Sequence, residues 1–405
     1  MTLVLNTLET NDYTTEQIKA LLADKDADIE IVDTADFKIK HCMGCNNCWL
    51  KTPGICSIKD DYEFIIKKMV KASNLWLVTD TEFGFVNYRG KRIMDRLMPM
   101  LNMTIEIRDG WERHQVRYHA MNVGVIYKGN GNQELLEEWS ERTAVNIGGH
   151  SLGVFRIDKD EAHESSVSGN ATTISSATSP EKMEHIVIIN GSPRVQKFSN
   201  TDKIIKSFTQ GLESEGISHE LYSLSNRSEW DKAREAFMNN TQIIIALPLY
   251  VECVPGTLLE FLTTISTERK QPAQISFILH GGFEEGHQLR LGEKFLQSLP
   301  AQLGCTYGGS LIKGGTFALR MRDNEYIKKM TQKMLDSYAT MSKLFAQSNN
   351  FMFPEAKKFT GHEKNPWIFA LLFKLFFKRL VKKNFERFAK AWGCTRPLDD
   401  KVYSE

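Results

Sequence analysis

The chain has 405 residues, of which 41% are apolar and 25% are charged, so it exceeds one average α/β domain and can form two cores. Its net charge of +1 gives no reason to expect nucleic acid or an acidic partner. The first residues have no basic start and no long apolar run, and four of the seven cysteines lie close together. We therefore expect a cytoplasmic protein with a metal or cluster site instead of a disulfide framework.

Short apolar runs alternate with amphipathic segments from the first residue. In the first half, strands are predicted at 3–5, 29–32, 75–78, 121–127 and 151–157, and helices at 15–22, 60–71, 89–101 and 133–146. In the second half, strands are predicted at 185–190, 220–224, 243–247, 275–280 and 310–313, and helices at 201–215, 230–238, 255–265, 286–303 and 324–345. This alternation predicts two α/β units, each a five-stranded parallel sheet with helices on both faces.

Residues 158–183 interrupt the pattern with a polar, small and aperiodic stretch that is typical of a flexible linker. The sequence thus predicts a first domain at 1–157, a linker at 158–183, a second domain at 184–349 and a tail at 350–405. The two halves resemble a duplicated domain. Residues 3–6, 74–78 and 121–127 of the first half align with 187–190, 242–246 and 274–280 of the second.

The loop that follows the first strand of the second half has the composition of a phosphate site. A phosphate needs backbone N–H groups, hydroxyls and positive charge at the start of a helix. Between strand 187–190 and the helix from 201, the loop offers all of these groups. They come from Gly191, Ser192, Arg194, Lys197, Ser199, Asn200 and Thr201.

Gly-Ser-Pro-Arg at 191–194, with Asn-Thr at 200–201, resembles the fingerprint of NAD(P)H-dependent FMN reductases, a flavodoxin-like family in which this loop binds the FMN phosphate. Ser199 stands where that family often has glycine. The segment 247–256 resembles the family's stretch along the isoalloxazine ring, although Leu259 replaces a lysine. The resemblance implies ring contacts from a second set of residues. These are Pro248, Leu249, Tyr250, Val251, Gly281 and Gly282.

The first half has lost this chemistry at the matching positions. Glu9 and Asp12 would place carboxylates where a dianionic phosphate belongs, and Asp80 replaces the proline after the third strand. We expect no FMN in this loop. The segment 83–97 still resembles the part of the family that often lies at the dimer contact. It is either a solvated basic helix, with Arg89, Lys91, Arg92 and Arg96 in water, or a surface that helps to cover the flavin of the second half.

Four cysteines form a C-x2-C-x2-C-x7-C pattern at Cys42, Cys45, Cys48 and Cys56. Four thiolates at these spacings suit a [4Fe–4S] cluster or a tetrahedral zinc site, and reduced thiols or disulfides remain alternatives. The pattern, followed by Lys-Asp-Asp at 59–61, resembles the compact motif of iron–sulfur flavoproteins. That resemblance implies a cluster which exchanges electrons with FMN, so the cysteine loop should approach the flavin.

The tail contains a predicted helix at 365–383 that begins at a proline and combines an aromatic face with lysines. It either docks on its own domain, which we favour, or lies on a membrane surface.

The combined features predict an FMN-dependent oxidoreductase that takes a hydride from NAD(P)H. The electrons would pass to a quinone, a flavin or another small acceptor, directly or through an iron–sulfur cluster. The alternative is a non-enzymatic FMN and iron–sulfur electron carrier or redox sensor. No side chain is assigned as catalytic. Because reductases of this family often pair as symmetric dimers, the fused halves are expected to form a pseudo-dimer, with or without further homo-oligomerisation.

Overall fold

The computed structural model describes residues 1–9, 15–23, 28–108, 110–157, 183–321 and 325–404. Its first half is built on a parallel sheet with the strand order β2-β1-β3-β7-β8. These strands are β1 (Thr2–Asn6), β2 (Ile29–Asp33), β3 (Asn74–Glu82), β7 (Met121–Lys128) and β8 (Gly148–Arg156). A short strand, β4 (Phe85–Val86), pairs antiparallel with the end of β3.

The second half repeats this arrangement with the strand order β10-β9-β11-β12-β13. Its strands are β9 (His185–Asn190), β10 (Ser218–Ser223), β11 (Gln242–Pro248), β12 (Gln274–His280) and β13 (Thr306–Lys313). In both sheets the second strand lies outside the first and the third strand returns to its other side, which is the flavodoxin-like order. The prediction of two tandem flavodoxin-like domains with five-stranded parallel sheets is confirmed.

Helices cover both faces of each sheet, because the buried strands are apolar on both sides. Leu3 and Leu5 of β1 face the core that lies between the two sheets, whereas Val4 faces the opposite side. The helices that contribute to the shared core are α3 (Tyr62–Met69), α4 (Tyr88–Met94), α5 (Gln133–Asn146), α7 (Trp230–Asn239), α8 (Gly256–Leu262) and α9 (Arg290–Gln302). The outer faces carry α1 (Thr15–Leu22), α6 (Asn200–Ser214), α10 (Glu325–Ser348) and α11 (Pro354–Phe359).

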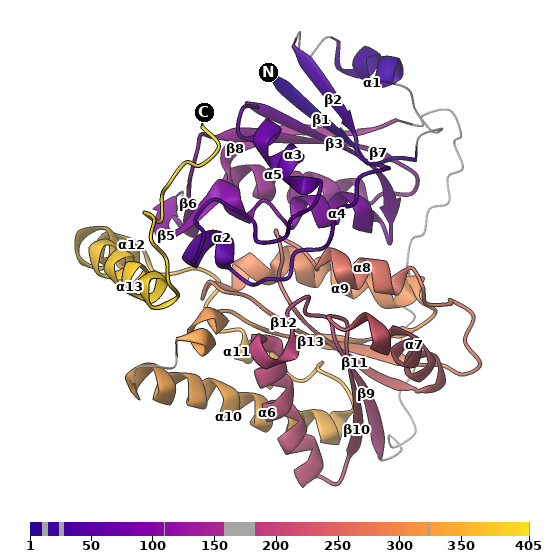
Figure 1. Cartoon of the computed structure of the whole chain (residues 1–405). Helices are drawn as coiled ribbons and strands as arrows, with labels where there is room; N and C mark the ends of the chain where they lie inside the picture. The colour runs from indigo at the N-terminus through magenta and orange to yellow at the C-terminus, as the bar shows by residue number, and fades with distance from the viewer. Residues whose placement is uncertain (10–14, 24–27, 109, 158–182, 322–324, 405) are drawn as a thin grey trace.

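The two halves share one continuous hydrophobic core (Figure 1). Equivalent helices meet across it: α4 packs on α8, and α5 packs on α9. Phe85 of the first half and Phe295 of the second have ring centroids 5.5 Å apart at this contact. A pairing of equivalent elements is what a two-fold relation between the halves produces.

The predicted helix at 89–101 is wrong in its second half. Helix α4 ends at Met94, a 3-10 turn follows at Met98–Met100, and the chain then forms a hairpin of β5 (Leu101–Arg108) and β6 (Trp111–Val116). Pro99 lies in that turn, where proline is compatible with the start of a helical turn but not with the interior of a helix. The residues from Leu101 alternate apolar and polar, which is the period of a strand.

The tail forms a continuous helical segment made of α12 (Trp367–Leu372), a π-turn (Phe373–Phe377) and α13 (Lys378–Ala391). It docks, as we favoured, but its main contacts are β5 and the short helix α2 (Asn47–Leu50) of the first half. The last residues then run back over the first half (Figure 1). There Arg117 donates hydrogen bonds to the carbonyls of Leu398 and Asp400. Among the described residues, no helix is long and apolar enough to cross a bilayer.

Two features predicted from the sequence fall outside the described residues. These are Asp12 of the degenerate loop and nearly all of the linker, at 158–182.

Two carboxyl groups meet where the hairpin contacts the second half. The backbone N–H of Glu112 donates to the side chain of Glu285 over 3.1 Å, and the backbone N–H of Glu284 donates to Glu112 over 3.4 Å. Burial, followed by the neighbouring Glu285 carboxylate, raises the pKa of Glu112 to about 7. Glu112 therefore keeps its proton in the folded chain at pH values where the unfolded chain has lost it.

We predict that this carboxyl makes the fold less stable as the pH rises. The folded pKa lies above the unfolded one, so the contribution is fully favourable below about pH 4.5 and is lost as the pH rises to about 7. The loss is at most about 3 kcal/mol. Glu112→Gln should flatten this part of the profile of unfolding free energy against pH between 5 and 8. An unchanged slope in the variant would contradict the assignment.

Candidate functional site

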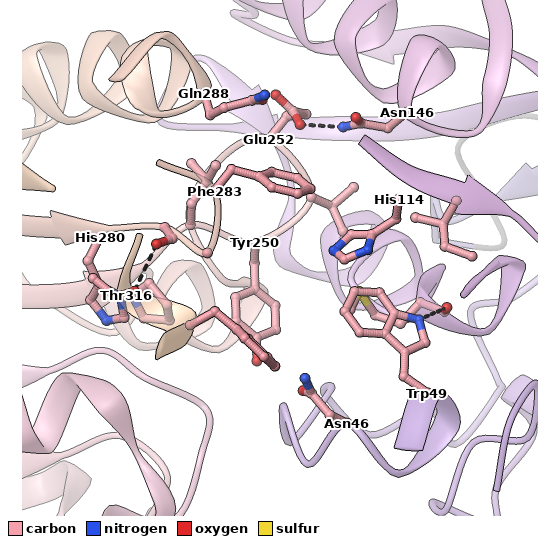
Figure 2. Close-up of a pocket in the computed structure, with 18 of the residues that line it drawn as sticks. Asn46, Trp49, His114, Asn146, Tyr250, Glu252, His280, Phe283, Gln288 and Thr316 are labelled. Carbon is pink, nitrogen blue, oxygen red and sulfur yellow. Dashed lines mark hydrogen bonds between the residues drawn. The ribbon is translucent and has the colours of Figure 1, made fainter. Parts of the chain in front are cut away.

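The carboxyl ends of the parallel strands of the second half open onto a cavity of about 280 Å³ (Figure 2). Ten of the thirteen residues that the sequence suggests for the phosphate loop and the ring contacts line it, because the loops after parallel strands share one edge of the sheet. They are Ser192, Arg194, Asn200, Thr201, Pro248, Leu249, Tyr250, Val251, Gly281 and Gly282. Gly191 and Lys197 do not line it. Ser199 lies behind this wall, where it supports the loop.

Hydroxyl groups organise the start of α6. Ser199 is the N-cap of the helix, and its Oγ accepts a hydrogen bond from the backbone N–H of Asp202. The same hydroxyl donates to Ser192 Oγ over 3.2 Å, and Ser192 Oγ in turn accepts from the backbone N–H of Arg194. The side chains of Ser192, Ser199 and Thr201 are all buried. This loop therefore presents oriented dipoles at the positive end of a fifteen-residue helix.

Two guanidinium groups reach this cavity with buried nitrogens that have no partner. Nε of Arg194 is unpaired, and so are Nε and Nη1 of Arg320. Burial, then the repulsion of Arg194, lowers the pKa of Arg320 to about 10, so it stays charged at neutral pH. The buried Oδ1 of Asn200 also lacks a partner, but it is an acceptor and suits a donor of a ligand instead of an anion. Buried, unpaired guanidinium N–H groups are costly, so the two arginines suit an anion at this corner of the cavity.

Arg320 was not predicted from the sequence. It ends the 3-10 turn Thr316–Arg320 that follows β13. The available signal was a cation shortly after the fifth parallel strand, where Gly314 and Gly315 mark a loop at the same edge of the sheet.

His280 joins two loops of the cavity through both of its ring nitrogens. Its Nε2 bonds to the hydroxyl of Thr201 over 2.8 Å, and its Nδ1 bonds to that of Thr316 over 2.9 Å (Figure 2). Burial lowers the pKa of His280 to about 3, so the ring is neutral. It fixes the loop after β13 to the start of α6.

The loop after β11 contains a tight turn with an unusual backbone. Tyr250 and Cys253 exchange two backbone hydrogen bonds, and the central residues Val251 and Glu252 have φ values of 39° and 65°. Neither residue is a glycine, and a β-branched valine in the left-handed region is strained. Such a turn persists only when its surroundings hold it.

Side chains of the first half hold this turn. Lys91 Nζ donates to the carbonyl of Tyr250 over 2.8 Å, and Trp139 Nε1 donates to the carbonyl of Val251 over 2.9 Å. Lys91 is fully buried and pairs with Asp95, whose other oxygen accepts from the first N–H of α8. The interpretation of segment 83–97 as a solvated basic helix is therefore wrong for Lys91, and also for the buried Arg96.

A buried ion pair also holds the turn at 250–253. We call the contacts of Lys91, Trp139 and Arg142 with this turn the clamp. Arg142 Nε donates to Glu252 over 2.6 Å, and Asn146 donates to the other oxygen of the same carboxylate (Figure 2). Nη2 of Arg142 donates to the carbonyls of His287 and Gln288, and Nη1 donates to Nε2 of His287. Helix α5 thus ties two cavity-lining loops of the second half together.

The cysteine loop lies against the same cavity. Cys42, Cys45, Cys48 and Cys56 line a small adjoining cavity of about 30 Å³, and the two cavities share Asn46, Met98 and Tyr250. Gly44 has φ +59°, and a Cβ there would lie 2.0 Å from the Tyr250 hydroxyl. Arg194 also donates to the carbonyl of Gly44. Only glycine allows this close approach of the cysteine loop to the loops of the second half.

Acidic residues anchor the base of the cysteine loop. Arg96 donates to both oxygens of Asp60 and, over 3.3 Å, to the sulfur of Cys56. Asp60 also accepts from the backbone N–H of Lys40, and Asp61 accepts from that of Lys38. The motif at 59–61 therefore fixes the shape of the loop.

All four cysteines line one cavity and Arg96 donates to the sulfur of Cys56, so the residue types suit a thiolate-ligated metal or cluster. As placed in the described part of the chain, however, no three cysteine, histidine or carboxylate groups stand close enough together to hold a metal ion.

Apolar and aromatic side chains form the remaining wall of the large cavity, and the sequence did not predict them. They come from α2, the hairpin, the loop after β12, the turn after β13 and the tail. These residues are Trp49, Met103, Ile105, His114, Phe283, Phe317 and Phe385. Figure 2 shows Trp49, His114 and Phe283 among them. Burial lowers the pKa of His114 to about 4, so this wall carries a neutral imidazole.

In the first half, an ion-pair group occupies the position that matches the phosphate loop. Arg89 donates to Glu9 over 2.8 Å and to Asp80 over 3.3 Å. Two carboxylates at this position disfavour a phosphate, so the absence of FMN here stays a prediction with a physical reason.

We predict that Arg142→Met destabilises the chain by about 3 kcal/mol, because it leaves Glu252 buried and unpaired. Adding Glu252→Gln should restore more than half of the loss. Arg290→Met, which breaks a half-exposed pair with Glu363, should cost less than about 1 kcal/mol. Urea unfolding of the variants measures these differences. A double variant as unstable as Arg142→Met alone would contradict the clamp.

No protein-family model matches the chain. The chain is 34% identical over 113 residues to an iron–sulfur flavoprotein of Methanocaldococcus jannaschii, in a match that covers 28% of this chain and 53% of the relative, about half its length. It is 37% identical over 162 residues to an iron–sulfur flavoprotein of Archaeoglobus fulgidus, which covers 38% of this chain and 76% of that protein.

Two solved structures similar to parts of the chain are oxidoreductases. An NAD(P)H:quinone oxidoreductase from Methanothermobacter marburgensis is 12% identical, with a TM-score of 0.32, and the match covers 42% of this chain and all of the other. An FMN-dependent NADH-azoreductase of Bacillus anthracis in complex with FMN is 16% identical, with a TM-score of 0.30, and the match covers 40% of this chain and all of the other.

The match to the Archaeoglobus protein spans three quarters of that relative at more than one-third identity. The chain therefore belongs to the iron–sulfur flavoprotein family.

Proposed function

We propose that the chain is an FMN-dependent oxidoreductase that takes a hydride from NAD(P)H and passes electrons to a small acceptor. The observation that carries this proposal is the pair of arginines with unpaired buried nitrogens, Arg194 and Arg320, at the hydroxyl-lined start of α6. A phosphate monoester dianion is the anion that suits two guanidinium groups, several hydroxyls and a helix N-terminus together.

The cavity also offers places for the rest of FMN. Ser192, Asn200 and Thr201 would hold the phosphate with the two arginines. The loops 248–251 and 281–282 would lie along the isoalloxazine ring, where their backbone can orient it. FMN, when bound, supplies hydride and single-electron chemistry. The chain itself supplies binding, orientation and an apolar wall that excludes water from one side of the cavity.

We infer that the four cysteines hold an iron–sulfur cluster. The two relatives are named iron–sulfur flavoproteins, and the cysteine spacing suits four thiolate ligands. The cysteine cavity adjoins the proposed flavin cavity through Tyr250, Asn46 and Met98. This adjacency supports electron transfer between two cofactors in one chain.

We also infer that the halves form a covalent pseudo-dimer with divided roles. The pairs α4 with α8 and α5 with α9 support a two-fold relation. The first half would contribute the cysteine site and the clamp, and the second half would contribute the flavin site.

The wall of Trp49, His114, Phe283, Phe317 and Phe385 supports a planar, apolar acceptor such as a quinone or a flavin. Steady oxidation of NADH or NADPH with an artificial acceptor distinguishes this enzyme from a mere electron carrier.

The phosphate assignment predicts that Arg320→Met and Arg194→Met each weaken FMN binding by roughly 10- to 100-fold, because a hydrogen bond to a charged group contributes about 1.5–3 kcal/mol. Lys197→Met is the matched control, since Lys197 lies in the same loop but is exposed. Quenching of FMN fluorescence by the flavin-free chain measures the affinities. Equal affinities in all four proteins would overturn the proposal.

The cluster assignment predicts about four iron atoms per chain after purification without air. Cys45→Ala should lose the iron and keep FMN, whereas Cys305→Ala, which changes a buried cysteine of the second half, should keep both. Metal analysis and the visible spectrum read out the result. Stoichiometric zinc without iron would contradict an electron-transfer role for this loop.

A further inference from the structure

The helical tail exposes a broad apolar face although its other side is docked. Phe373, Phe385 and Ala389 are buried against the body of the protein. The first of these residues, Phe373, begins the π-turn, which ends at Phe377. The opposite side carries large apolar side chains that are 40–78% exposed. They are Trp367, Ile368, Leu371, Leu372, Leu375, Phe376, Phe377 and Leu380.

This face is not the ordinary surface of a soluble domain. Single exposed apolar side chains are common, but eight of them within fourteen residues form a contiguous patch. Six of the eight repeat as neighbouring pairs at 367–368, 371–372 and 375–376, a spacing of four residues that keeps them on one side of the helix. The segment lies at the edge of the molecule, so nothing of the two sheets covers its outer side (Figure 1).

The charges that the helix itself places around this face all have one sign, although Lys382 lies 4.0 Å from the carboxylate of Asp399. Between residues 364 and 385 the chain has six cations and no carboxylate. They are Lys364, Lys374, Lys378, Arg379, Lys382 and Lys383, all of them exposed. The first acidic residue of the helix is Glu386, one turn beyond. A second copy of the chain would bring these cations against their own kind, which disfavours self-association through this face.

We propose that this helix, residues 367–383, binds the surface of an anionic lipid bilayer. An interfacial helix combines an apolar face containing Trp, Phe and Leu with a basic border, and it lies in the plane of the membrane. Trp367 stands at the start of the apolar face, and tryptophan prefers the headgroup region. The cations attract anionic headgroups, while the apolar side chains enter the boundary of the acyl chains. The docked side stays on the protein, so binding requires no unfolding of the tail.

This surface lies close to the proposed flavin cavity. Phe385, on the docked side of the same helix, lines that cavity and packs against Phe317 with ring centroids 6.1 Å apart. A helix with its side chains is about 10 Å across. A bound membrane would therefore lie about one helix width from the cavity.

The test is sedimentation of the full chain with vesicles. Phosphatidylcholine vesicles are compared with vesicles that contain about 30% phosphatidylglycerol. We expect binding to the anionic vesicles that weakens with salt, and at least tenfold weaker binding to the neutral ones. Leu375→Glu/Phe376→Glu should abolish binding. Lys378→Gln/Lys383→Gln should weaken it by about 30-fold, since each cation near the surface contributes about fivefold.

Met352→Glu is the matched control, because Met352 is 57% exposed but lies outside this helix. Circular dichroism and the bound flavin check that every variant is folded, so loss of binding does not depend on the proposed oxidoreductase activity. Four results would overturn the proposal. They are no binding to either vesicle, equal binding by the Leu375→Glu/Phe376→Glu variant, a dimer in light scattering that this variant dissociates, and capture of a protein partner by the same face with no vesicle binding.

Discussion

The turn at 250–253 is the constraint on which the site depends. Val251 and Glu252 are held in a left-handed backbone that neither residue favours, at a cost of order 1–3 kcal/mol each. The force that holds them comes from the other half of the chain, through Lys91, Trp139 and Arg142. Because the turn places Tyr250 against Gly44, the same contact sets the position of the cysteine loop. Separating the halves would release the turn and both adjoining cavities.

The two halves share a fold but differ in what their loops can do. In the second half, the loops after the first and fifth strands bring two arginines with unpaired buried nitrogens to a helix N-terminus. In the first half, Arg89 pairs with Glu9 and Asp80 at the equivalent position, although its Nε lacks a partner. The two positions therefore differ in the carboxylates that lie beside their arginines.

Much of the site was predictable because parallel strands end at one edge of their sheet. The apolar runs placed the loops after β9, β11 and β12, and these loops contain the ten predicted residues that line the cavity. Arg320 was missed because its role appears only once the fifth strand is placed beside the fourth. The hairpin from Leu101 was not predicted, because its apolar residues also fit the continuation of the preceding helix. The clamp was beyond prediction, since no local preference favours a left-handed valine and its partners lie more than 100 residues away. The contacts of the tail with α2 and β5 are equally remote in sequence.

A titration of the flavin-free chain with FMN most directly tests whether the two halves have unequal roles, because only the second half is expected to bind FMN. Absorbance or calorimetry counts the tight sites per chain. The structure predicts one FMN per chain, bound in the second half and lost on substitution of Arg194 together with Arg320. Two equivalent tight sites, or none, would contradict the division of roles between the halves.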